Sequence, residues 1–98
     1  MEWESYADGS TLGQAGIEGG DILKDEVIDG SARITLEKGG FAPFTITCGI
    51  YGMMCHTVFA AEETEAMEKY EGMKFDLKEF LSTPEMDVEW LEGFVEKW

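Results

Sequence analysis

Basic residues are scarce in this chain. Seven Lys and Arg stand against 21 Asp and Glu, which gives a formal net charge of −14 over 98 residues. A protein that binds nucleic acid needs positive charge to neutralise phosphates, so this class of function is excluded. An acidic surface can instead steer a protein towards a basic partner protein, although acidity also serves solubility alone.

Cysteine and histidine are also rare, with two Cys and one His. The first residues, MEWESYADG, contain neither a basic stretch nor an apolar run, so we expect no secretory signal and a cytoplasmic protein. In that compartment Cys48 and Cys55 are expected to be free thiols, packed as small buried side chains. Two thiols do not complete a tetrahedral zinc site, and strand alternation puts His56 on the opposite face. No metal or cofactor is therefore expected.

Residues 39–61 contain no Asp, Glu, Lys or Arg. A membrane-spanning helix needs about 20 predominantly apolar residues, whereas this run has a Pro, several Gly and polar residues in alternation with apolar ones. The alternation predicts β-structure, and we expect no membrane insertion. Tyr51-Gly52 at its centre is typical of a two-residue hairpin loop. That loop pairs Cys48 with Cys55 and Thr47 with His56.

Two further strands are predicted before this hairpin, at residues 21–28 and 32–37. They are joined by Asp29-Gly30, a strong hairpin dipeptide. Matching the apolar faces of neighbouring strands places Ile34 beside Ile46 and Arg33 beside Thr47. The sequence therefore predicts a four-stranded antiparallel β-meander.

The period changes after the hairpin to the three- and four-residue steps of amphipathic helices. The first predicted stripe is Ala66, Tyr70, Met73, Leu77, Phe80 and Leu81, and the second is Val88, Leu91, Phe94, Val95 and Trp98. Gly72 is expected to kink or split the first helix. Thr83 is the expected N-cap of the second helix, with Pro84 at its first position.

These elements predict a single α+β domain over residues 1–98, a two-layer sandwich with both helices packed on one face of the sheet. Residues 1–20 form a loose Gly-rich segment, 21–60 the sheet and 61–98 the helices. The glycines of residues 1–20 are not followed by Gly-Lys-Ser/Thr, so a phosphate-binding loop is not predicted.

One polar cluster on the open face of the predicted sheet could carry chemistry. Arg33, Thr47 and His56 are expected in one row across three strands, with Thr35 and Thr45 adjoining and Gly49 leaving an indentation. Such a group is suited to binding an anion or transferring a proton. An ordinary solvated sheet surface is the alternative interpretation.

The sequence favours a non-enzymatic interaction module, such as an inhibitor or immunity-type protein, that binds a basic partner through its acidic surface. The alternative is a small-ligand binder or enzyme that uses Arg33, Thr35, Thr45, Thr47 and His56. A third hypothesis is a homodimer formed through the open sheet face, because Met54 and Val58 are expected to add apolar surface there.

Overall fold

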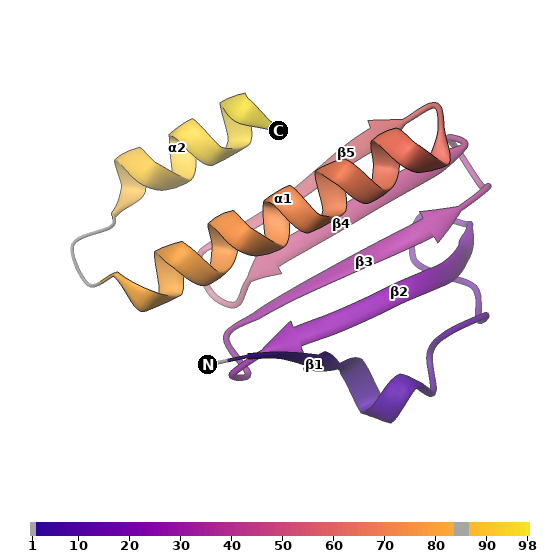
Figure 1. Cartoon of the computed structure of the whole chain (residues 1–98), viewed down its shortest axis with the longest axis horizontal. Coiled ribbons are helices and arrows are strands. Elements are labelled where there is room, and N and C mark those ends of the chain that lie inside the picture. The colour runs from indigo at the N-terminus through magenta and orange to yellow at the C-terminus, as the bar shows by residue number, and fades with distance from the viewer. Residues whose placement is uncertain (1, 84–86) are drawn as a thin grey trace.

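The computed structural model describes residues 2–83 and 87–98. Its sheet has five antiparallel strands in chain order, one more than predicted (Figure 1). The strands are β1 (Trp3–Ser5), β2 (Asp21–Ile28), β3 (Ala32–Lys38), β4 (Phe44–Ile50) and β5 (Met54–Ala60). The additional strand comes from the segment expected to be loose, where Trp3 pairs with Ile28. A short 3-10 turn, η1 (Tyr6–Gly9), follows β1.

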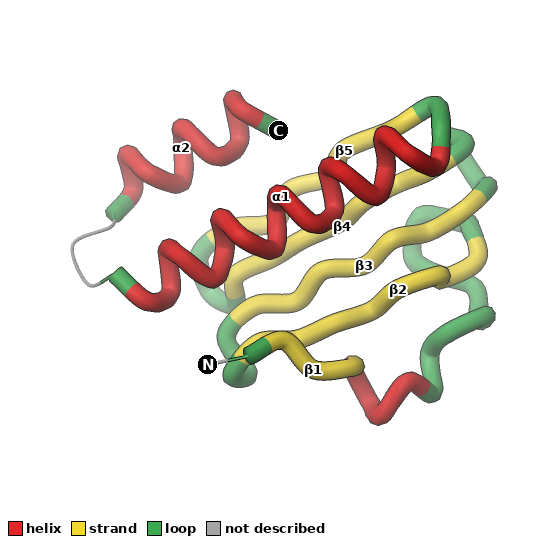
Figure 2. The backbone as a smooth tube through the Cα atoms, in the orientation of Figure 1, coloured by secondary structure: helices red, strands yellow, loops and turns green. Residues whose placement is uncertain are grey.

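Helices α1 (Glu63–Ser82) and α2 (Val88–Lys97) form a second layer on one face of the sheet (Figure 2). The core lies between the two layers. Its members from the sheet are Ile28, Ala32, Ile34, Leu36, Phe44, Ile46, Cys48, Ile50, Val58 and Ala60. Its members from the helices are Ala66, Tyr70, Met73, Leu77, Phe80, Leu91 and Phe94. The predicted α+β class and the position of the helices on one face are confirmed. Within the described residues, neither helix is long and apolar enough to cross a membrane.

Strands β3 and β4 pair two residues away from the predicted register. Ile34 lies opposite Cys48, and Arg33 lies opposite Gly49. A shift of two residues keeps every side chain on its predicted face, because side chains alternate with period two. The faces of β3 and β4 are therefore as expected, although their cross-strand neighbours are not.

The hairpin between β4 and β5 contains one residue more than predicted. The expected turn is present: the Met53 N–H donates to the Ile50 carbonyl over 2.9 Å, and Gly52 has a φ of +78°. The ladder then continues with Ile50 opposite Met54, so Met53 is an extra residue on the β5 side. An extra residue of this kind acts as a β-bulge and moves the pairing of the strand by one position.

A one-residue shift moves every β5 side chain to the other face. Cys48 therefore lies opposite His56 rather than Cys55, and Cys55 lies opposite Gly49. Cys48 is buried, whereas Cys55 is exposed. The prediction that both cysteines face the core was wrong for Cys55, because the turn residues do not reveal the extra position at Met53.

Helix α1 follows its predicted stripe without interruption through Gly72. The stripe residues Ala66, Tyr70, Met73, Leu77 and Phe80 are buried. Gly72 does not kink the helix. It gives room for the ring of Trp98, since a Cβ at this position would lie 2.6 Å from Trp98 Cη2. The Trp98 ring is held there by its Nε1–H, which donates to Asp76 Oδ2 over 3.0 Å.

Helix α2 begins at Val88, later than predicted. Its N-cap is Asp87, whose Oδ1 accepts from the Glu89 N–H over 3.0 Å. Thr83, the expected N-cap, is instead the C-cap of α1. Pro84, the expected first helical position, lies outside the described residues. The Asp87 carboxylate therefore caps the helix in the way that was expected of Thr83.

The α2 stripe is only partly buried. Leu91 and Phe94 pack in the core, whereas Val88 and Val95 are 64% and 42% exposed. Trp90 contributes instead, with its ring centroid 5.3 Å from that of Phe94. One side of α2 thus presents apolar side chains to solvent.

The two helical glycines give a matched test of the contact between Gly72 and Trp98. Gly93 in α2 has no atom within 4 Å of an added Cβ, so Gly93→Ala should stabilise the fold by about 1 kcal/mol through helix propensity. Gly72→Ala should gain much less or lose stability, because Trp98 must leave its position. Urea unfolding measures both changes.

A Trp98→Ala background serves as the control for this pair. There, Gly72→Ala should give the same gain as Gly93→Ala, because the obstructing ring is gone. Equal stabilisation by both changes in the wild-type background would show that Trp98 does not restrict Gly72.

Candidate functional site

The face of the sheet opposite the helices carries three rows of side chains across β3, β4 and β5. The rows are Arg33, Gly49 and Cys55; Thr35, Thr47 and Thr57; and Glu37, Thr45 and Phe59. Asp25 of β2 extends the second row, and Ile22 extends the third. Four of the five predicted site residues, Arg33, Thr35, Thr45 and Thr47, therefore share this face.

His56 does not join them. It lies on the helix face of β5, with its ring centroid 6.2 Å from that of Phe94 in α2. Its Nε2 is buried and has no hydrogen-bond partner within residues 2–83 and 87–98. Met54 and Val58 also turn towards the helices, so the two apolar residues that suggested a dimer do not lie on the open face. All three differences follow from the extra residue at Met53.

A pocket of about 340 Å³ opens on this face. Its lining from the sheet is Ile22, Arg33, Thr35, Glu37, Thr47, Cys48, Gly49 and Cys55, with Tyr51 from the β4–β5 turn. Its lining from the N-terminal segment is Thr11, Gln14, Ala15, Gly16 and Ile17. The pocket therefore depends on residues 11–17 lying across the sheet, whereas this segment was expected to be loose.

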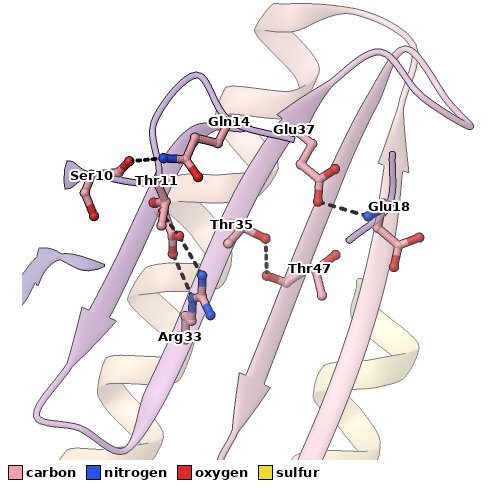
Figure 3. A network of polar contacts seen from close by, with 9 residues as sticks. Ser10, Thr11, Gln14, Glu18, Arg33, Thr35, Glu37 and Thr47 are labelled. Atoms are coloured by element: carbon pink, nitrogen blue, oxygen red, sulfur yellow. Dashed lines mark hydrogen bonds and ion pairs between the residues drawn. The ribbon is translucent and has the colours of Figure 1, made fainter. Parts of the chain in front are cut away.

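Glu37 holds this segment over the sheet. Its side chain is almost fully buried, and its Oε1 accepts from the Gly20 N–H over 3.0 Å. Its Oε2 receives a longer contact of 3.4 Å from the Glu18 N–H (Figure 3). Gly16 permits this approach, because a Cβ there would overlap the Glu37 carboxylate. A backbone bridge between Ala15 and Asp21 closes the same loop.

Arg33 and Asp25 form a bidentate ion pair on this face. Arg33 Nε donates to Asp25 Oδ1 over 2.9 Å, and Nη2 donates to Oδ2 over 2.7 Å. The Asp25 side chain is fully buried, and Thr11 Oγ1 adds a hydrogen bond of 2.8 Å. Tyr6 covers the guanidinium, with 3.6 Å from Arg33 Cζ to the ring centroid. The hydrogen bond that Arg33 donates to Asp25 is the main cause that raises the pKa of Arg33.

This pairing changes what Arg33 can do. An Arg guanidinium stays protonated near neutral pH, so Arg33 cannot act as a general base. Its charge is compensated by Asp25, and Glu37 adds a further carboxylate to the lining. The positive charge of Arg33 is thus balanced at this face by the carboxylates of Asp25 and Glu37, which disfavours an anion in the pocket.

The threonines supply neutral polar groups. Thr35 Oγ1 lies 3.4 Å from the Thr47 carbonyl, to which it donates (Figure 3). Thr47 Oγ1 is buried and has no hydrogen-bond partner in the described part of the chain. Thr45 is almost fully buried and does not line the pocket. Of the predicted site residues, Arg33, Thr35 and Thr47 line the pocket. The Thr47 hydroxyl is the one without a hydrogen-bond partner among the described residues.

The two thiols differ in their surroundings. Burial raises the pKa of the Cys48 thiol to about 12. Cys55 is exposed and lines the pocket. Within the described ranges, no three His, Cys, Asp or Glu side chains lie together as a metal-binding group.

No protein-family model, curated protein or solved structure matches this chain.

Removing the cation from the buried ion pair should lower the free energy of unfolding more than removing a cation from an exposed pair. Arg33→Met leaves the Asp25 charge buried without a cation, and we expect a loss of about 3 kcal/mol in the free energy of unfolding. Lys78→Met removes a cation from the exposed pair with Glu2 and should cost less than about 1 kcal/mol. Urea unfolding compares the two, and equal losses would show that the Asp25 pair contributes no more than a surface pair.

The thiols should also differ in reactivity. Iodoacetamide attacks thiolates, so at pH 8 the native protein should gain one carbamidomethyl group, at Cys55. Cys48 should react only after denaturation, because it is buried and its pKa is raised to about 12. Peptide mass spectrometry assigns the modified residue. Rapid labelling of Cys48 in the native protein would contradict its placement in the core.

Proposed function

We propose that the protein binds a small molecule in the pocket of the open sheet face. The observation that carries the proposal is the Thr47 hydroxyl, which is buried at the pocket without a hydrogen-bond partner among the described residues. A buried polar group without a partner costs free energy, and a ligand that hydrogen-bonds to it removes that cost. The volume of about 340 Å³ lies at the lower end of the range for ligand sites, which favours a compact molecule.

The lining suggests the chemistry of this molecule. Ala15, Ile17, Ile22 and Tyr51 provide apolar and aromatic contacts for its body. Because Arg33 is compensated by Asp25 and Glu37 is a carboxylate, a neutral or cationic head group fits better than an anion. We therefore propose a compact, mostly apolar ligand whose neutral or cationic head hydrogen-bonds to Thr47.

The proposed role is binding and not catalysis. The two strongest polar groups are already engaged by the protein: Arg33 by Asp25 and Glu37 by the Gly20 N–H. Groups held in this way position a ligand, whereas a general base must reach the proton that it abstracts. The placement of His56 on the other face removes the residue best suited to proton transfer near neutral pH.

A matched pair of probes tests the pocket. We expect 2-phenylethylamine to shift the amide signals of Arg33, Thr47 and Gly49 in nuclear magnetic resonance titrations, and 3-phenylpropionate to shift them far less. Thr47→Val removes the hydroxyl with little change in shape and should weaken amine binding about fivefold, the value of one hydrogen bond.

Thr57→Val is the control for this variant, because Thr57 lies in the same row and outside the pocket lining. It should leave binding unchanged. Equal binding of the two probes would refute the proposed charge preference. Amine binding that is insensitive to Thr47→Val would refute the role of its hydroxyl.

We propose a second function, binding to a basic partner protein, from the surface of the helical layer. Seven glutamates there are exposed and take part in no ion pair within the described ranges: Glu62, Glu63, Glu68, Glu79, Glu89, Glu92 and Glu96. Such a surface attracts cationic proteins and loses this attraction in salt. An inhibitor or immunity-type role in the cytoplasm is consistent with this surface and with the two free thiols.

A further inference from the structure

The outer edge of β5 is a hydrogen-bonding surface without cover from another strand. Met54–Ala60 is the last strand in the sheet order and pairs with β4 alone among the described strands. Its seven residues, MCHTVFA, include no Pro and no charged residue. Soluble proteins usually protect such an edge with charges, Pro, short strands or a covering loop, because a bare edge pairs with other chains.

The opposite edge of the sheet is protected in these ways. Its terminal strand β1 has three residues and includes Glu4. The beginning of β2 is covered by the N-terminal segment, where the Gly13 N–H donates to the Ile22 carbonyl and the Ile22 N–H donates to the Gln14 carbonyl. The contrast between the two edges indicates that the bare edge of β5 has a use.

One contact shows which groups of β5 point outward. Lys69 Nζ, from α1, donates to the Phe59 carbonyl over 3.1 Å. In an antiparallel ladder every second residue directs its N–H and C=O away from its partner strand. Phe59 therefore belongs to the outward set together with Cys55 and Thr57. Because Lys69 occupies the end at Phe59, the bare part of the edge is the end at Cys55 and Thr57.

An apolar groove lies beside this bare part, between the start of β5 and α2. It has a volume of about 480 Å³ and is lined by Met53, Met54, Val88, Leu91, Glu92, Val95 and Glu96. Val88 and Val95 are the exposed stripe residues of α2 described above. Glu92 and Glu96 lie one helical turn apart and take part in no ion pair within residues 2–83 and 87–98. The groove is thus apolar inside and negatively charged at its border.

We propose that the edge of β5 and this groove bind an extended basic segment of a partner protein by strand addition. The segment hydrogen-bonds through its main chain to Cys55 and Thr57. Alternate side chains enter the groove over Met54, and Lys or Arg side chains pair with Glu92 and Glu96. The proposal deepens the second function, binding to a basic partner, and rests on it for the sign of the partner's charge.

A labelled synthetic peptide tests the proposal on the full chain. The probe is Val-Lys-Val-Lys-Val-Lys-Val, and its control carries Pro in place of the third and fifth residues, both Val, which blocks strand pairing and keeps the charge. Fluorescence anisotropy at low salt should show binding of the probe and at least about tenfold weaker binding of the control, the loss expected when main-chain hydrogen bonds are removed. Hydrogen exchange should show new protection of the Cys55 and Thr57 amides in the complex.

Two variants separate the contribution of the β5 main chain to peptide binding from that of the negative charges. Thr57→Pro removes the outward N–H and should abolish binding. If this variant does not fold, the amide protection in the wild-type protein shows whether the peptide pairs with the edge of β5. The double variant Glu92→Lys/Glu96→Lys should weaken binding about tenfold through charge repulsion. Its control, Glu68→Lys/Glu79→Lys, makes the same change of charge on α1 outside the groove and should weaken binding only about twofold.

The outcomes distinguish this proposal from the broader one. Equal binding of both peptides, without protection of the Cys55 and Thr57 amides, overturns strand addition and retains binding through the acidic surface. If neither peptide binds, both strand addition and binding of a basic partner through the acidic surface are overturned. A dimer on size-exclusion chromatography whose Cys55 and Thr57 amides are protected without peptide assigns the edge to a second copy and overturns the basic occupant.

Discussion

The ion pair between Asp25 and Arg33 is the interaction on which the open face of the sheet depends. A fully buried carboxylate is unfavourable unless it is paired and hydrogen-bonded, and Asp25 accepts from both Arg33 and Thr11. The pair fixes the position of the guanidinium, and the Tyr6 ring lies over it. Tyr6 and Thr11 belong to the N-terminal segment, so the requirement to satisfy one buried charge also ties this segment to the sheet. The pocket exists because the segment stays there.

This requirement explains which parts of the site could be predicted from the sequence. The alternation in residues 32–37 and 44–50 placed Arg33, Thr35 and Thr47 on one face, because a period of two is a local property of the chain. The contacts of Asp25 with Thr11 and of Glu37 with Gly20 join positions 14 and 17 residues apart. Periodicity carries no information on such contacts. A carboxylate at Glu37, beside Arg33 and Thr35 on the polar face, was the available signal.

The parts of the fold that depend on local sequence patterns were also predictable. Helix stripes and strand alternation are local, so the α+β class and the buried side of α1 followed from the sequence. The face of β5 did not, because it depends on whether Met53 belongs to the turn or to the strand. Tyr51-Gly52 is compatible with both, and the choice inverts the surroundings of His56 and Cys55. The extra residue Met53 therefore altered the composition of the expected site more than the missed strand β1 or the later start of α2 did.

The two proposed sites meet at Cys55. Its side chain lines the pocket on the open face, and its main chain lies on the bare edge of β5. A strand added to that edge would order the backbone that forms one wall of the pocket, and a ligand in the pocket would restrain the same backbone. Thermodynamic linkage requires any such effect to be reciprocal: if the small molecule changes the affinity for a basic segment by some factor, the segment changes the affinity for the small molecule by the same factor. The position of Cys55, set by the extra residue at Met53, is thus the point at which the two proposed binding functions would be coupled.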